Sequence, residues 1–166
     1  MPYYVWMMAN GLFILGSALY IWMFQPYHST VVLFGKLFAQ IAIVLFAVNI
    51  NMYFIFLVIR KSKNRAVKVR LSKMARKMMK VHIPIAIIGT NLIVLHAGMM
   101  ALELGKEIGF FHPKMLTGYL GVLLLVLTLF AGWLRHKKAS GFRRKFHLTM
   151  ALIFGGVFIV HLFFPL

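Results

Sequence analysis

Apolar residues follow one another in long runs along this chain of 166 residues, and polar residues gather in the short stretches between the runs. Each run is long enough to cross a hydrocarbon core about 30 Å thick at about 1.5 Å per residue. Because the backbone must satisfy its own hydrogen bonds in lipid, the runs predict helices. We therefore expect a single all-α transmembrane domain over residues 1–166. Its five transmembrane helices should span about residues 3–24, 31–59, 81–102, 115–134 and 146–164.

Composition supports a membrane location, since 62% of the residues are hydrophobic and only 13% are charged. Soluble domains contain about 25% charged residues. The formal net charge of +17 is concentrated in two stretches between apolar runs, which hold ten and six of the 19 lysines and arginines. These stretches, residues 60–80 and 135–145, are predicted to be cytoplasmic loops because basic residues resist translocation. Nucleic-acid binding is therefore not expected.

The two basic loops predict the direction of every helix. They follow the second and fourth apolar runs, so the N-terminus should lie in the cytoplasm and the C-terminus outside. The third and fifth runs should then cross the membrane in the same direction. The expected location is a cytoplasmic membrane of bacterial type, with several passes through the lipid bilayer.

The first basic loop has a helical pattern of its own. Val67, Leu71, Met74 and Met78 follow helical spacing, and lysine and arginine occupy the remaining positions. The pattern fits an amphipathic helix on anionic headgroups, or a cytoplasmic extension of the membrane helices. A docking surface for an acidic partner is a third interpretation.

Four histidines form two matched pairs inside apolar runs, His82 with His96 and His147 with His161. Both pairs are fourteen positions apart, a step of about 1400° on an α-helix and about 21 Å along its axis. Each pair therefore shares one helix face, with one member near each membrane surface. Ionisable residues inside a membrane are costly and usually functional.

The parallel direction of the third and fifth runs assigns partners to these histidines. His82 and His147 should share the cytoplasmic level, and His96 and His161 should share the outer level. Two imidazoles that face each other can fill both axial positions of one haem iron. The chain contains no cysteine, so covalent c-type haem and thiolate-bound iron–sulfur clusters are excluded. We therefore expect two stacked b haems, with His82 and His147 on the inner iron and His96 and His161 on the outer iron.

Small residues lie between the members of each pair. Gly89 lies midway between one pair, and Gly155 and Gly156 lie midway between the other. A macrocycle between helices needs small residues where it approaches the backbone, so these glycines are expected to bind the cofactor. Basic residues at the cytoplasmic helix ends are placed to neutralise the propionates of an inner haem, namely Lys80, Arg143, Arg144 and Lys145.

Polar residues inside the first two runs leave two interpretations open. Asn10, Gln40, Asn49 and Asn51 are expected to form hydrogen bonds between helices. A quinone headgroup is the alternative partner, which would make quinone a second cofactor.

The four histidines, on two parallel helices separated by one returning helix, resemble the membrane domain of ferric reductases and NADPH oxidases. They also resemble cytochrome b of quinol:cytochrome c reductases. The resemblance covers about residues 80–165 and implies electron transfer across the membrane between two b haems. This chain departs from the oxidase pattern, since no flavin- or nicotinamide-binding domain is expected within residues 1–166. The electron donor is therefore expected to be a separate flavoprotein or a quinol, with an external acceptor on the other side.

Alternative functions remain open at this point. The chain could be an oxidoreductase by itself, or a haem-bearing anchor subunit of a larger dehydrogenase complex or oligomer. It could also be a non-redox transporter or structural protein whose histidines handle metal ions or protons, or the histidines could simply form hydrogen bonds between helices. His112, Glu103 and Glu107 share one outer loop and include the only two carboxylates. They are a candidate substrate or quinol site, with ordinary interfacial residues as the alternative.

Overall fold

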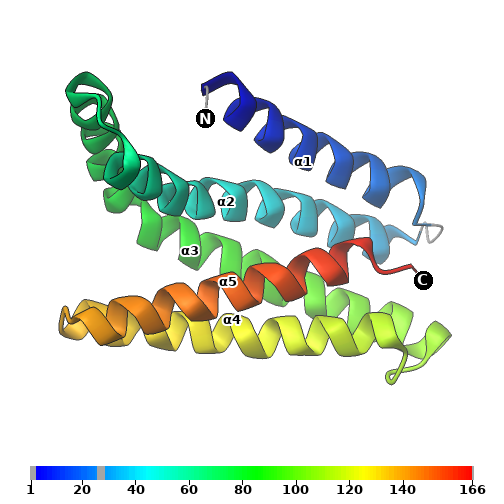
Figure 1. Cartoon of the computed structure of the whole chain (residues 1–166). Helices are drawn as coiled ribbons and strands as arrows, with labels where there is room; N and C mark the ends of the chain where they lie inside the picture. Colours follow the sequence, from blue (N-terminus) through cyan, green and yellow to red (C-terminus); the bar gives the residue numbers. More distant parts are fainter. Residues whose placement is uncertain (1–2, 26–28, 166) are drawn as a thin grey trace. The chain divides into compact units, whose positions relative to one another are not determined.

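The computed structural model describes residues 3–25 and 29–165, which form five helices (Figure 1). All five are long and apolar enough to cross a membrane, which confirms the prediction of an all-α, multi-pass membrane protein. The helices are α1 (Tyr3–Met23), α2 (Thr30–Lys61), α3 (Arg65–Ile108), α4 (Pro113–Lys137) and α5 (Gly141–Phe163).

The helices α2 and α3 are longer than the sequence pattern indicated. Only residues 62–64 connect them, and α3 begins at Arg65, so most of the stretch expected as a basic loop is helical. The Asn64 side chain accepts hydrogen bonds from the backbone N–H groups of Ala66 at 2.9 Å and Val67 at 3.4 Å. Asparagine is a preferred residue at this position because it satisfies the first free N–H groups of a helix. The basic stretch is thus the first part of α3, which agrees with the interpretation of this stretch as a cytoplasmic extension of a membrane helix.

Helix α3 ends where the backbone turns into the left-handed region. Gly109, the residue after Ile108, has a φ of +89°. Glycine adopts this conformation without the steric penalty of a side chain, which makes it the usual residue just past a helix end.

Contacts along the chain divide it into two compact units. The first unit contains Met1–Trp22 and Lys36–Leu95, and the second contains Met23–Gly35 and His96–Leu166. Helices α2 and α3 each contribute to both units. His82 therefore belongs to the first unit, and the other three paired histidines belong to the second.

Polar contacts join α1 to α2 inside the first unit. Asn51 Nδ2 donates to Asn10 Oδ1 at 2.7 Å, and Gln40 Nε2 lies 3.5 Å from the hydroxyl of the fully buried Ser17. These contacts confirm that the amides bond between helices. The opposite face of α1 exposes a stripe of apolar side chains at helical spacing, as lipid contact requires. The stripe comprises Met8, Leu12, Leu15 and Leu19.

The second unit is built on an antiparallel hairpin of α4 and α5 (Figure 1). A cation bonds to a carbonyl group near a helix end at each end of the hairpin. The Arg143 guanidinium donates to the carbonyl of Leu134 at 2.9 Å, at the end of α4. The Lys114 ammonium donates to the carbonyl of Phe164 at 2.6 Å, at the end of α5. Basic side chains near a helix C-terminus interact favourably with its last carbonyls, and each of these two bonds joins α4 to α5.

Candidate functional site

His96 of α3 and His161 of α5 lie close to each other in the second unit, with one ring roughly edge-on to the other. Their ring centroids are 6.5 Å apart, and the ring planes are inclined by 73°. Metal–imidazole bonds about 2 Å long place two imidazole rings on opposite sides of one metal about 6 Å apart, centre to centre. The measured separation therefore suits two axial ligands of one iron.

The Nδ1 atoms of both rings are held by oxygen atoms of neighbouring helices. His96 Nδ1 donates to the backbone carbonyl of Gly35 in α2 at 2.9 Å. His161 Nδ1 lies 3.1 Å from the hydroxyl oxygen of Thr117 in α4. The Thr117 hydroxyl donates its own proton to the carbonyl of Lys114 at 2.8 Å, so its oxygen accepts from His161. Both rings therefore carry their proton on Nδ1.

This tautomer is the one that a metal ligand needs. With the proton on Nδ1, the lone pair of a neutral imidazole is on Nε2, the atom that then binds a metal. Hydrogen bonds to the other ring nitrogen also fix the orientation of ligating histidines. Lys114 acts twice at this place, since its carbonyl accepts from Thr117 and its ammonium group holds the end of α5.

His147 in α5 shows the same arrangement within the second unit. Its Nδ1 donates to the backbone carbonyl of Thr128 in α4 at 3.1 Å. A carbonyl oxygen can only accept, so this ring also has its proton on Nδ1.

His82 in α3 shows the arrangement again within the first unit. Its Nδ1 lies 3.2 Å from Oδ1 of Asn49 in α2, and Asn49 Nδ2 points to the backbone carbonyl of His82 at 3.5 Å. The amide group thus bonds the same residue twice, with its oxygen accepting from the ring. His82 and His147 belong to different units, so their pairing stays a prediction.

The residues that face the histidines repeat at the histidine spacing. Gly35 and Asn49, which accept from His96 and His82, are fourteen positions apart in α2. Gly118 and Gly132 of α4, which lie against His161 and His147, are also fourteen positions apart. Neither spacing entered the sequence prediction, although both can be read from the sequence. When two helices run antiparallel, two histidines fourteen positions apart on one helix face two positions that are also fourteen apart on the other.

The two α4 glycines make room for the imidazole rings. A Cβ atom on Gly118 would lie 3.1 Å from Cε1 of His161. A Cβ atom on Gly132 would lie 3.3 Å from Cε1 and 3.4 Å from Nδ1 of His147. The distances to the two Cε1 atoms are shorter than ordinary van der Waals contacts, so the rings occupy space that any larger residue would need.

The glycines predicted from the sequence to bind a cofactor lie in more varied surroundings. A Cβ atom on Gly89 would be 3.8 Å from Leu45, an ordinary contact. Gly155 is buried in α5, and Gly156 is exposed with open space around its Cα. Their role at a macrocycle stays a prediction.

The candidate outer site of His112, Glu103 and Glu107 has a different local structure. His112 precedes α4, where its Nδ1 accepts a hydrogen bond from the backbone N–H of Lys114 at 3.3 Å. The Ser29 hydroxyl donates to Glu103 at 3.4 Å, and Glu107 is exposed. His112 and Glu103 thus have structural partners of their own, which favours the interpretation as ordinary interfacial residues.

The parts of the chain that the structure describes contain no group of three or more histidine, cysteine or acidic residues that could hold a metal ion. A haem iron requires only two ligands from the protein, since the macrocycle supplies the others. Comparisons with protein families, with curated proteins and with solved structures find no match to this chain.

Proposed function

We propose that this protein transfers electrons across a membrane through two b haems, each held by two histidines. The observation that carries the proposal is the facing pair of His96 and His161, with ring centroids 6.5 Å apart. Both rings have their Nδ1 atoms held by oxygen acceptors of neighbouring helices, which leaves Nε2 to ligate.

The donor set of the chain fits this cofactor. Four neutral imidazoles in apolar helices suit iron held in a porphyrin, and the chain has no cysteine for a thiolate ligand. We assign His96 and His161 to an outer haem. We assign His82 and His147 to an inner haem, by their equal spacing from the outer pair.

The residues of the chain orient the ligands and exclude other chemistry. A bound haem supplies an iron that exchanges one electron at a time. Gly35, Thr117, Thr128 and Asn49 hold the four rings in one tautomer. Two histidines per iron leave no position for oxygen, so electron transfer is the expected function.

The proposal includes a topology and partners. The basic ends of the helices lie in the cytoplasm, and the N-terminus lies on the same side. The donor is a cytosolic flavoprotein or a quinol, and the acceptor is on the outer side. A role as the haem-bearing anchor of a larger complex uses the same site and differs only in its need for a partner.

Haem content per chain and a reduced-minus-oxidised absorption spectrum test the proposal. We expect two b-type haems in the purified protein. His96→Ala and His161→Ala should each leave one haem, and the double variant should also leave one, because both histidines serve the same iron. His82→Ala combined with His96→Ala should leave none. A protein without b-type bands, or a histidine variant with unchanged haem content, would contradict the proposal.

A further inference from the structure

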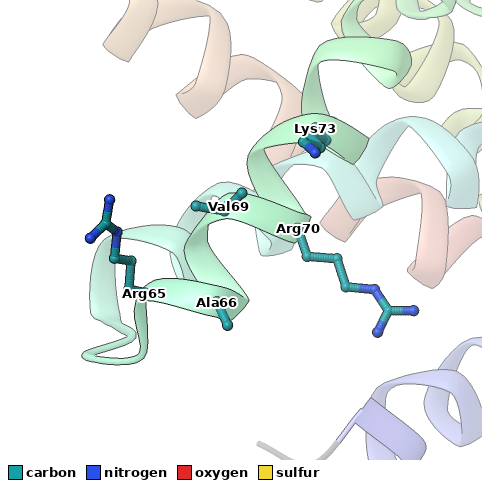
Figure 2. A pocket seen from close by; sticks show the side chains of 5 residues that line it. All are labelled: Arg65, Ala66, Val69, Arg70 and Lys73. Carbon is teal, nitrogen blue, oxygen red and sulfur yellow. The ribbon is translucent and has the colours of Figure 1, made fainter.

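The first part of α3 carries a continuous basic surface, which we call the basic ridge. Figure 2 shows Arg65 and Arg70 extending from the helix on either side of Ala66 and Val69. These four residues and Lys73 line a shallow pocket. Every cation of the ridge is exposed. The ridge comprises Arg65, Lys68, Arg70, Lys73, Arg76, Lys77 and Lys80.

The opposite side of this helix is already packed. Ala75 is only 2% exposed, and Leu71, Met74 and Met78 are half-buried. The connection at residues 62–64 brings the end of α2 beside the start of α3, and Ile55 of α2 is 3% exposed. A helix that lies in the headgroup region needs its apolar face for the lipid. Here most of that face is at least half-buried, although Val67 at its start is 37% exposed, and the ridge lies on the other side of the helix.

The charge of the ridge is not compensated within its own stretch. No acidic residue occurs between Arg60 and Lys80, and the only two carboxylates of the chain lie near the other end of α3. Lys73 and Lys77 are four positions apart, and like charges at this spacing destabilise a helix by about 0.2–0.5 kcal/mol per pair. Exposed cations without internal counter-charges are the electrostatic complement of an acidic surface.

We infer that the basic ridge docks the acidic face of a soluble electron-donor protein. The inference rests on the proposed function, because the ridge leads directly to a proposed ligand. Lys80, its last cation, is two residues before His82 in the same helix. A protein bound along the ridge is therefore brought to the cytoplasmic level assigned to the inner haem.

The docking test measures binding without electron transfer. The full chain is placed in phosphatidylcholine nanodiscs, and association of flavodoxin, an acidic flavoprotein, is followed by biolayer interferometry. Neutralising two ridge lysines, K73Q/K77Q, should slow association about tenfold at low ionic strength. The effect should vanish near 1 M salt, where the screening length is about 3 Å.

The matched control removes the same charge elsewhere. Lys137 ends α4, Lys138 follows it, and both are exposed, so K137Q/K138Q should change the association rate by less than about twofold. An equal loss in both variants would show a response to net charge alone and would overturn the inference. The inference would also be overturned if the unaltered chain did not bind flavodoxin. It would be overturned as well if phosphatidylserine in the nanodiscs abolished flavodoxin binding, because the ridge would then bind lipid headgroups. Haem-free protein should bind equally well, so this test can fail or succeed independently of the proposed function.

Discussion

The paired histidines of α3 bond to α2, and those of α5 bond to α4, but the two neighbouring helices hold the rings in different ways. In each pair of helices, the second helix presents histidines fourteen positions apart to an antiparallel neighbour. In α2 the facing positions are Gly35 and Asn49, and both accept a hydrogen bond from an imidazole. In α4 the facing positions are Gly118 and Gly132, which provide space, while nearby threonines provide the acceptors.

The difference shows which histidines depend on a side chain. His96 and His147 donate to backbone carbonyls, which no substitution removes. His82 and His161 donate to the side chains of Asn49 and Thr117. In the proposed pairing, each haem therefore receives one histidine oriented by the backbone and one oriented by a side chain. The two haems should then respond to single substitutions in matching ways, although the residues come from different helices.

The largest effect is expected from Asn49→Leu in α2. Leucine has a similar volume but cannot accept from His82 Nδ1 or donate to the His82 carbonyl, so both contacts are lost. Losing a partner that orients a metal ligand lowers affinity about 10- to 100-fold. We therefore expect haem to transfer from the inner site to apomyoglobin about 10 to 100 times faster than in the unaltered protein.

Asn51→Leu is the control for this variant. Asn51 also lies in α2 but bonds Asn10 of α1 rather than a histidine. Its loss should lower stability by about 1 kcal/mol and leave haem transfer unchanged. Equal haem transfer from the two asparagine variants would show that Asn49 does not orient a ligand.

Long apolar runs were sufficient to predict the five helices, because a long apolar segment in lipid must satisfy its own backbone hydrogen bonds as a helix. They were not sufficient to predict where α3 begins. The residues before Lys80 are mostly charged, which suggested a loop, but Leu71, Met74 and Ala75 pack on one side and Asn64 caps the first turn. Tertiary packing of a narrow apolar stripe outweighed the polar composition of the stretch.

The sequence also predicted the candidate histidines, but it revealed their partners only in part. Asn49 could be expected to bond between helices because an amide in lipid needs a partner. The roles of the Gly35 and Thr128 carbonyls as hydrogen-bond acceptors could not be predicted from the sequence, since every residue carries a carbonyl. Gly118 and Gly132 could have been recognised by their fourteen-residue spacing, which matches that of the histidines in the neighbouring helix.

An intermediate effect is expected from Thr117→Val in α4. Valine keeps the shape of threonine but removes the oxygen that accepts from His161 and donates to the carbonyl of Lys114. The buried His161 ring then keeps only its backbone partner Lys114, and haem transfer from the outer site should become about ten times faster. Spectral titration of haem release to apomyoglobin resolves this phase from that of the inner haem.

Thr128→Val separates the side chain from the backbone at the corresponding place. The Thr128 hydroxyl donates to the carbonyl of Leu124, whereas His147 is held by the Thr128 carbonyl. This variant should therefore release haem at the unaltered rate. Acceleration in Thr128→Val as large as that in Thr117→Val would refute the distinction between side-chain and backbone orientation.

The smallest effect is expected from Gly118→Ala, which tests the space provided by α4. The new methyl group would lie 3.1 Å from Cε1 of His161, so the ring must shift by a few tenths of an ångström. Overpacking costs about 1–3 kcal/mol, and the low end of that range corresponds to about fivefold faster haem release from the outer site.

Gly121→Ala is the control, because no atom lies within 4 Å of a Cβ at that position. It gains the helix propensity of alanine without meeting a ring, so stability should rise by about 1 kcal/mol with haem release unchanged. The two alanine variants differ only in what the methyl group meets. If both variants released haem at the same rate, α4 would contribute glycine for helix packing alone, and its match to the spacing of the histidines would have no bearing on the haem site.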